Sequence, residues 1–201
     1  MKDYLRKKED DNLTTLKMSN SLNIGLQKCA LSYSKDGLIK FGNKIMIHNI
    51  LSDVFVACDT SIAVPDQSES FTVTGTHSSD ITNRAVFTIR KFEDDKSHYN
   101  DDLVHYGQKI CLEAHPKMHK RKLFLRAYPY TQNNFAKLSK KMEISVTAKV
   151  NDFSTVWTIE HPEIKHRFQS MGQPVEAEKD VLIKNCSLGH WLATDKSYWM
   201  E

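Results

Sequence analysis

Apolar and polar residues alternate along three separate stretches of this chain, and the three stretches resemble one another. They cover residues 39–49, 104–114 and 175–185, so that consecutive copies begin 65 and 71 residues apart. Because successive side chains of a β-strand point to opposite faces, a period of two predicts strands with one buried face. The inward positions are Ile39, Phe41, Ile45 and Ile47, then Val104, Tyr106, Ile110 and Leu112, then Val175, Ala177, Val181 and Ile183.

A glycine interrupts the alternating pattern in the first two copies. Gly42 and Gly107 occupy the same position, and the third copy has Glu178 there. A glycine inside a strand pattern is typical of a bulge or a tight bend. Each copy is therefore predicted to form two short strand segments that a bend joins.

Further strand patterns follow each copy at matching distances. A second pattern follows all three copies, at residues 54–59, 123–126 and 190–195. The first two copies also carry a later one, at residues 86–90 and 156–160. One such unit cannot bury its apolar face alone, whereas three units around a common centre can.

This repetition predicts an all-β, β-trefoil-like domain over residues 31–201. The pseudo-repeats are expected at about 31–100, 101–170 and 171–201, and the third is incomplete because no later strand pattern follows residue 195. An open barrel has unpaired strand edges, which favour contact with a partner. Residues 1–30 are charge-rich with few apolar positions in their first half, which predicts a short N-terminal arm, helical or extended.

Charge and cysteine content limit the function only weakly. The net charge of +3 permits an acidic partner without requiring a nucleic acid. No apolar run approaches the roughly 18 residues of a membrane span, and the first eleven residues lack the apolar core of a secretion signal. The four cysteines have no C-x-x-C spacing and are expected to be reduced.

The sequence carries no complete catalytic or metal-binding signature. His115 and His119 are four residues apart, but Pro116 lies between them and the glutamate of an H-E-x-x-H motif is missing. There is no G-x-S-x-G elbow and no phosphate-binding loop. Residues 76–80 bring Ser, His and Asp together in sequence, and an enzyme that used them would need them in a buried cleft. We therefore predict no catalytic residues, no metal and no cofactor.

Two basic clusters are the candidate partner-binding residues. They are Lys117, Lys120, Arg121 and Lys122 in one connection, and Lys137, Lys140 and Lys141 in another. Solvated turns without a partner are one interpretation, and contact with an acidic protein surface is another. The clusters lack interleaved aromatic residues on which bases could stack, which argues against a nucleic acid.

An ordered set of segments resembles a known family. Residues 1–5, 34–46, 104–112 and 181–186 are similar, in order and spacing, to the cilia- and flagella-associated protein 161 family. The resemblance implies a non-enzymatic microtubule inner protein in the lumen of ciliary and flagellar doublet microtubules. Its implied partners are α/β-tubulin and neighbouring inner proteins, with no nucleic acid, membrane or cofactor. It also implies that segments found at both ends of the family's pattern lie outside these 201 residues.

A second interpretation remains open beside the ciliary one. A β-trefoil in the cytosol could serve as a binding module for a small ligand or a protein. This interpretation depends on the fold alone, and one fold supports many functions.

Overall fold

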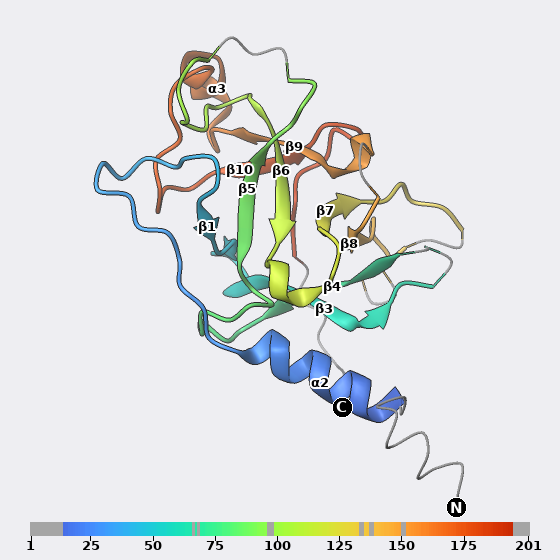
Figure 1. Cartoon of the computed structure of the whole chain (residues 1–201). Coiled ribbons are helices and arrows are strands. Elements are labelled where there is room, and N and C mark those ends of the chain that lie inside the picture. Colours follow the sequence, from blue (N-terminus) through green and yellow to red (C-terminus); the bar gives the residue numbers. More distant parts are fainter. Residues whose placement is uncertain are drawn as a thin grey trace, which may run out of the picture.

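The computed structural model describes residues 14–65, 67, 69–95, 99–132, 135–136, 139–149 and 152–194. Strands dominate these residues, in agreement with the predicted all-β class (Figure 1). The helical elements are α2 (Thr14–Leu26), η1 (Pro116–Met118), η2 (Phe153–Thr155) and α3 (Ile164–Ser170). The strands are β1 (Lys44–Ile45), β2 (His48–Asn49), β3 (Val54–Ala63), β4 (Ser70–Thr76), β5 (Phe87–Lys91), β6 (Lys109–Ala114), β7 (Phe124–Ala127), β8 (Ile144–Thr147), β9 (Val156–Glu160) and β10 (Leu182–Asn185).

The strands form one curled antiparallel sheet. Its order is β1-β5-β6-β7-β8-β4-β3-β2, with β9 beside β6 and β10 beside β9. The later strands β5 and β9 each lie between two strands that belong to consecutive copies of the repeated pattern. Ile45 of β1 lies opposite Phe87 of β5, and Ile110 of β6 lies opposite Trp157 of β9.

The inward positions of the pattern meet in a single hydrophobic core. Ile45, Ile110 and Val181, one from each copy, all belong to this cluster or pack against it. Trp157 lies at its centre with 1% of its surface exposed, and its indole N–H donates to the carbonyl of Leu125 over 2.9 Å. Period-two alternation thus placed the core correctly, because every inward residue of a strand faces the same side of the sheet.

Three equivalent residues bond to one another in a closed ring. The N–H of Ile39 donates to the carbonyl of Val175 over 2.9 Å. The N–H of Val104 donates to Ile39 over 2.9 Å, and that of Val175 donates to Val104 over 2.8 Å. Each residue opens one copy of the pattern, so the three copies meet at one point with their backbone groups satisfied by each other.

Burial differs among the three copies although their patterns match. The second copy is the most buried, with Ile110 only 1% exposed. Its equivalents Ile45 and Val181 are half-buried. Ala177, which the alternation predicts to point inward, is exposed, and this prediction was wrong. The second copy lies between β5 and β9, whereas the other two have a later strand on one side only among the described residues.

The bends predicted at the interrupting glycines are present. Gly42 and Gly107 have φ angles of 86° and 79°, in the left-handed region that favours glycine. Glu178 adopts the same region, with a φ of 61°, without being a glycine. The conformation is therefore common to all three copies, and the third holds it against the steric preference of its side chain.

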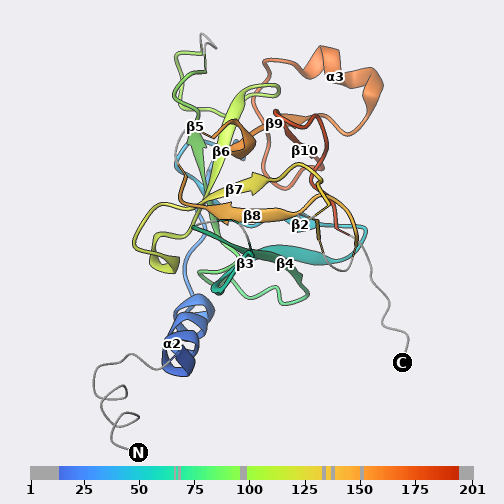
Figure 2. The same cartoon turned by 90° about the vertical axis from the view of Figure 1, so that its right-hand side faces the viewer.

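The N-terminal helix α2 packs beside β3 and η1 (Figure 2). The hydroxyls of Ser21 and Thr60 are 3.0 Å apart, and the Asn83 amide donates to the carbonyl of Ile24 over 2.8 Å. A Cβ atom on Gly25 would lie 3.4 Å from the Met118 methyl group, an ordinary van der Waals contact, so α2 passes close to this side chain. Residues 1–13 of the predicted N-terminal arm lie outside the described residues, and residues 14–26 of it form α2.

Candidate functional site

The first basic cluster lies in the connection between β6 and β7. Lys117 is part of the short helix η1. The next residue of this helix, Met118, is buried in the core. Lys117, Lys120, Arg121 and Lys122 are all exposed. Arg121 forms an ion pair with Glu69, which lies in the turn between β3 and β4. Part of the charge of the cluster is therefore neutralised within the chain.

The second basic cluster lies before β8, away from the first. Lys140 and Lys141 are exposed, and Lys137 lies outside the described residues. Lys140 is also placed over the ring of Phe135, 4.9 Å from its centroid. Phe124 pairs with Thr147 and Ala127 with Ile144, so the two clusters flank opposite ends of the β7–β8 hairpin. The structure therefore keeps the candidate residues as two separate basic surfaces.

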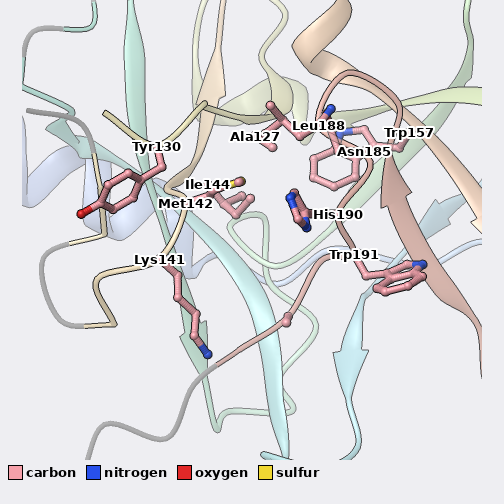
Figure 3. A pocket seen from close by; sticks show the side chains of 11 residues that line it. Ala127, Tyr130, Lys141, Met142, Ile144, Trp157, Asn185, Leu188, His190 and Trp191 are labelled. Carbon is pink, nitrogen blue, oxygen red and sulfur yellow. The ribbon is translucent and has the colours of Figure 1, made fainter. Parts of the chain in front are cut away.

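An apolar groove lies beside the second cluster (Figure 3). The β7–β8 hairpin forms one wall and the turn after β10 forms the other, around a cavity of about 370 Å³. Its lining residues are mainly apolar or aromatic: Ala127, Tyr130, Lys141, Met142, Ile144, Trp157, Asn185, Leu188, His190, Trp191 and Ala193. Its volume falls within the usual range of ligand pockets, which are also mostly apolar.

Polar contacts fix Trp191 on one wall of the groove. Its indole N–H donates to Glu160 over 3.2 Å, and the Arg167 guanidinium lies 5.2 Å from its ring centroid. Burial alone would raise the pKa of Glu160, but hydrogen bonds from Lys184 and Trp191 outweigh this effect and lower it. Glu160 therefore stays ionised at neutral pH and holds Trp191 in place.

Asn185 stabilises the turn after β10, which forms the same wall of the groove as Trp191. Its carbonyl oxygen accepts the N–H groups of Ser187 and Leu188, both over 3.1 Å. Asn49, at the same position in the first copy, accepts the N–H of Ser52 over 3.0 Å. The sequence interpretation missed this function, although the recurrence of asparagine at the end of two copies was a signal for it, since asparagine favours such turns.

Helix α3 carries a second apolar surface on the other side of the barrel from α2 (Figure 2). Ile164, Phe168 and Met171 are exposed there, Phe168 by 91%. Arg167 joins the helix to β9, because its guanidinium forms an ion pair with Glu160 over 3.7 Å. A rigid platform with exposed apolar side chains is a feature of protein contact sites.

The candidate catalytic segment is on the surface. Residues 77–80 are exposed, so they are not in the buried cleft that an enzyme would need. No group of three metal-binding side chains occurs in the described ranges, and His115 and His119 serve instead as local acceptors for the N–H groups of Lys117 and Arg121.

All four cysteines are free thiols. Burial raises the pKa of Cys58 to about 12 and that of Cys111 to about 11. Because the thiolate is the reactive form, these two side chains are chemically inert near neutral pH. Cys111 instead packs with Phe92 and Val156 in a small satellite core.

A family model described as "Cilia- and flagella-associated protein 161-like domain" matches residues 17–201. The chain belongs to this family. It is 25% identical to cilia- and flagella-associated protein 161 of Danio rerio over 211 residues, which cover 96% of this chain and 68% of the relative. The protein of the same name from Bos taurus is 23% identical over 216 residues, with 100% and 66% covered. The chain thus spans about two thirds of the length of these relatives.

Two solved structures share the fold of this family member at low sequence identity. The SDF2-like protein from Arabidopsis thaliana has a TM-score of 0.61 and 15% identity, and the match covers 80% of this chain and 81% of that one. A Caenorhabditis elegans protein of unknown function has a TM-score of 0.60 and 17% identity, covering 83% and 84%. Within the part of the chain that is described, no helix is both long and apolar enough to cross a bilayer.

Proposed function

We propose that this protein is a non-enzymatic structural component of the axoneme, bound in the lumen of ciliary and flagellar doublet microtubules. Its partners there are α/β-tubulin and neighbouring inner proteins. The observation that carries the proposal is the family match over residues 17–201. The described residues support it, because the groove beside the second basic cluster is mainly apolar and the candidate catalytic segment is exposed.

We further propose that the body is a β-trefoil whose three-fold axis passes through Ile39, Val104 and Val175. The ring of hydrogen bonds among these residues supports the proposal, since a three-fold axis requires three equivalent contacts. The shared left-handed bend at Gly42, Gly107 and Glu178 supports it as well. The pairing of β5 and β9 with consecutive copies is the arrangement that a three-unit barrel requires.

A body of this kind suits a protein that is held in a lattice. Several weak contacts from one rigid body act together, because the first contact raises the effective concentration of the others. The first basic cluster lies at the opposite end of the β7–β8 hairpin from the second cluster and its groove, so one molecule can contact several neighbours. The basic surfaces favour acidic protein surfaces through electrostatic complementarity.

The location is tested by expressing the tagged chain in a ciliated cell. We expect signal along the axoneme that survives detergent extraction and is released together with inner doublet components. A diffuse cytosolic signal, or release by detergent alone, would contradict the proposal. A variant with Ile110→Asp, which should not fold, provides the control for a signal that the tag alone produces.

The groove supports a second candidate, a ligand-binding module. Trp157 and Trp191 both line it, and aromatic walls are common in small-molecule sites. A thermal-shift screen with sugars and inositol phosphates tests this candidate. Stabilisation by one compound, lost in the Trp191→Ala variant, would favour it, whereas no stabilisation by any compound would remove it.

A further inference from the structure

Helix α2 packs on the barrel through small side chains and leaves larger apolar ones in solvent. Gly25 is buried, and Ser21, one turn before it, is half-buried. Met18, Leu22 and Leu26 are spaced four residues apart, so they form one stripe along the helix. Their side chains are exposed by 41%, 41% and 56%. The stripe is therefore accessible although the helix is docked.

Hydrogen bonds fix the last turn of this helix. The side-chain amide of Asn83 donates to the carbonyl of Ile24 over 2.8 Å, and its backbone N–H donates to Gln27 over 3.0 Å. The N–H of Arg84 donates to the carbonyl of Gly25 over 3.0 Å. Carbonyls in the last turn of a helix have no partner within the helix, so these bonds satisfy them. The apolar stripe is thus presented in a fixed position.

The exposed part of α2 carries no charge. Residues 18–27 contain no Asp, Glu, Lys, Arg or His, although 26% of the chain is charged. The centres of protein interfaces are depleted of charged residues and enriched in methionine. An accessible helix of this composition has the properties of an interface centre.

Basic side chains border this helix. The hydroxyls of Ser21 and Thr60 are in contact, and that of Thr60 also donates to the carbonyl of Met118 over 3.1 Å, so α2 adjoins η1 and the first basic cluster. In both views the connection between β6 and β7 lies directly above α2 (Figures 1 and 2). Lys28 is exposed just after the helix ends at Leu26.

Positive charge is in excess around α2. Three acidic residues belong to the neighbouring segments, and each has a local partner: Asp59 accepts from Ser61, Glu69 pairs with Arg121, and Asp80 accepts from Ser78. Among the described residues, no carboxylate pairs with Lys28, Lys117, Lys120 or Lys122. The border of the helix therefore attracts acidic groups.

The described chain ends away from this helix. The Thr194 hydroxyl contacts that of Ser52, just before β3, whereas Ser21 of α2 contacts Thr60 further along the same strand. At about 3.3 Å per residue, the strand from Val54 to Thr60 separates the two contacts by roughly 20 Å. A segment that continues from Thr194 therefore starts at the other end of β3.

We propose that α2 and the basic side chains beside it form one docking surface for a neighbouring protein of the doublet, whose matching surface is apolar at its centre and acidic around it. Burial of Met18, Leu22 and Leu26 supplies affinity, and pairing of Lys28 and Lys117 with acidic groups sets the orientation. The inference rests on the ciliary function proposed above and names the surface that this function uses.

Two matched variants of the tagged chain in a ciliated cell test the surface. Leu22→Gln with Leu26→Gln removes the stripe but keeps the net charge and the helix propensity. Ile50→Gln with Leu51→Gln makes the same change at two exposed residues in the turn before β3. After detergent extraction, the axoneme should retain at least fivefold less of the first variant than of the second, which should match the unsubstituted chain. Circular dichroism of the purified proteins checks that both variants fold.

The outcomes separate this inference from the proposed function. Loss of the unsubstituted chain from the extracted axoneme would overturn both. Retention of the unsubstituted chain, with equal retention or equal loss of the two variants, would overturn the docking surface alone.

Salt tests the stated chemistry of the partner. Raising sodium chloride from about 50 to about 300 mM during extraction should release the unsubstituted chain, because exposed charge pairs are screened. Lys28→Gln with Lys117→Gln should lower retention at the lower concentration and remove most of this salt dependence. Retention that does not respond to salt would exclude an acidic partner and overturn the proposal.

A photo-reactive amino acid at residue 22 identifies what covers the stripe. Irradiation of axonemes should join it to another protein within a segment that contains Asp or Glu, and the same group at residue 51 should not give this product. A cross-link to residues 1–13 or to any part of the chain after residue 194 would show that the chain covers its own helix, which would overturn the proposal. A cross-link to a second copy of the chain, or no cross-link, would also overturn it.

Discussion

The Met171 side chain packs directly over Gly107, so that a Cβ atom on residue 107 would overlap with its thioether end. This contact joins the bend of the second copy to the end of α3. Gly42 has the same backbone conformation in the first copy, but a Cβ there would meet no atom within 4 Å. The two glycines therefore differ in surroundings while sharing one backbone requirement.

Alanine substitutions separate these two effects. Gly42→Ala should reduce the free energy of unfolding by about 1 kcal/mol, since only the left-handed backbone opposes the new side chain. Gly107→Ala should cost about 2 kcal/mol, because Met171 must also move. Urea unfolding of both variants measures the difference. Equal losses would mean that the contact between Met171 and Gly107 carries no energy. In a Met171→Ala background, where the clash is absent, Gly107→Ala should cost no more than Gly42→Ala.

The burial gradient among the copies predicts unequal effects of the same substitution. Ile110→Asp buries a charge without a partner, which costs more than most domains can lose, and we expect it to prevent folding. Ile45→Asp, at the half-buried equivalent position, should leave a folded protein of lower melting temperature. Near-ultraviolet circular dichroism and thermal melts distinguish the two. A folded Ile110→Asp variant would show that the second copy is not the centre of the core.

Charge reversal in the first basic cluster tests its assignment as a binding surface. Lys120→Glu with Arg121→Glu breaks the exposed ion pair with Glu69, which should cost less than about 1 kcal/mol of stability. Binding to doublet microtubules should weaken in a co-sedimentation assay. The matched control is Lys165→Glu with Lys179→Glu, both exposed and distant in sequence from the cluster. Equal weakening by the control would mean that only net charge matters, and aggregation of the first variant would show that the cluster is structural.

The buried thiols predict a loss of stability in alkaline solution. Burial disfavours the thiolate and raises the pKa of Cys58 in the folded protein to about 12, above the ordinary thiol value of 9.0. Above pH 9 the unfolded chain releases this proton first, so the free energy of unfolding falls as pH rises towards 12. Urea melts at pH 8 and pH 10.5 measure the fall. Cys58→Ala should flatten this dependence, and a dependence unchanged by the substitution would assign it to other groups.

Reagent access provides an independent check on the same thiols. Iodoacetamide at pH 8 should label Cys29 and Cys186, which are only partly buried, before Cys58 and Cys111. Mass spectrometry at increasing times gives the order. Early labelling of Cys58 in the native protein would contradict its buried position.

Much of the body could be predicted from the printed sequence. Alternation located the strands of the three copies and their inward positions, because it follows from the geometry of a strand and does not depend on its neighbours. The bends at Gly42 and Gly107 were predictable for the same reason. Ala177 was not, since its exposure depends on which strand lies next to the third copy. Alternation did not predict β4 or β8, nor the core position of Val146.

The sequence pattern predicted neither the groove nor the ion pairs of the charged residues. Trp191 and Ile144 line one cavity although 47 positions separate them along the chain. The ion pair of Arg121 with Glu69 joins two hairpins that the sequence treats as unrelated loops. Such contacts depend on how hairpins pack, and the pattern of one strand contains no information about the packing.

The sequence by itself determined that this protein is a β structure with a recurring pattern, whose inward positions, except Ala177, belong to the core or pack against it. Local geometry is sufficient for that, because backbone pleating fixes where successive side chains point. Only the tertiary structure decided that the copies meet through Ile39, Val104 and Val175, and that the second copy is buried more deeply than the others. Those outcomes depend on which strands become neighbours, and long-range packing decides that.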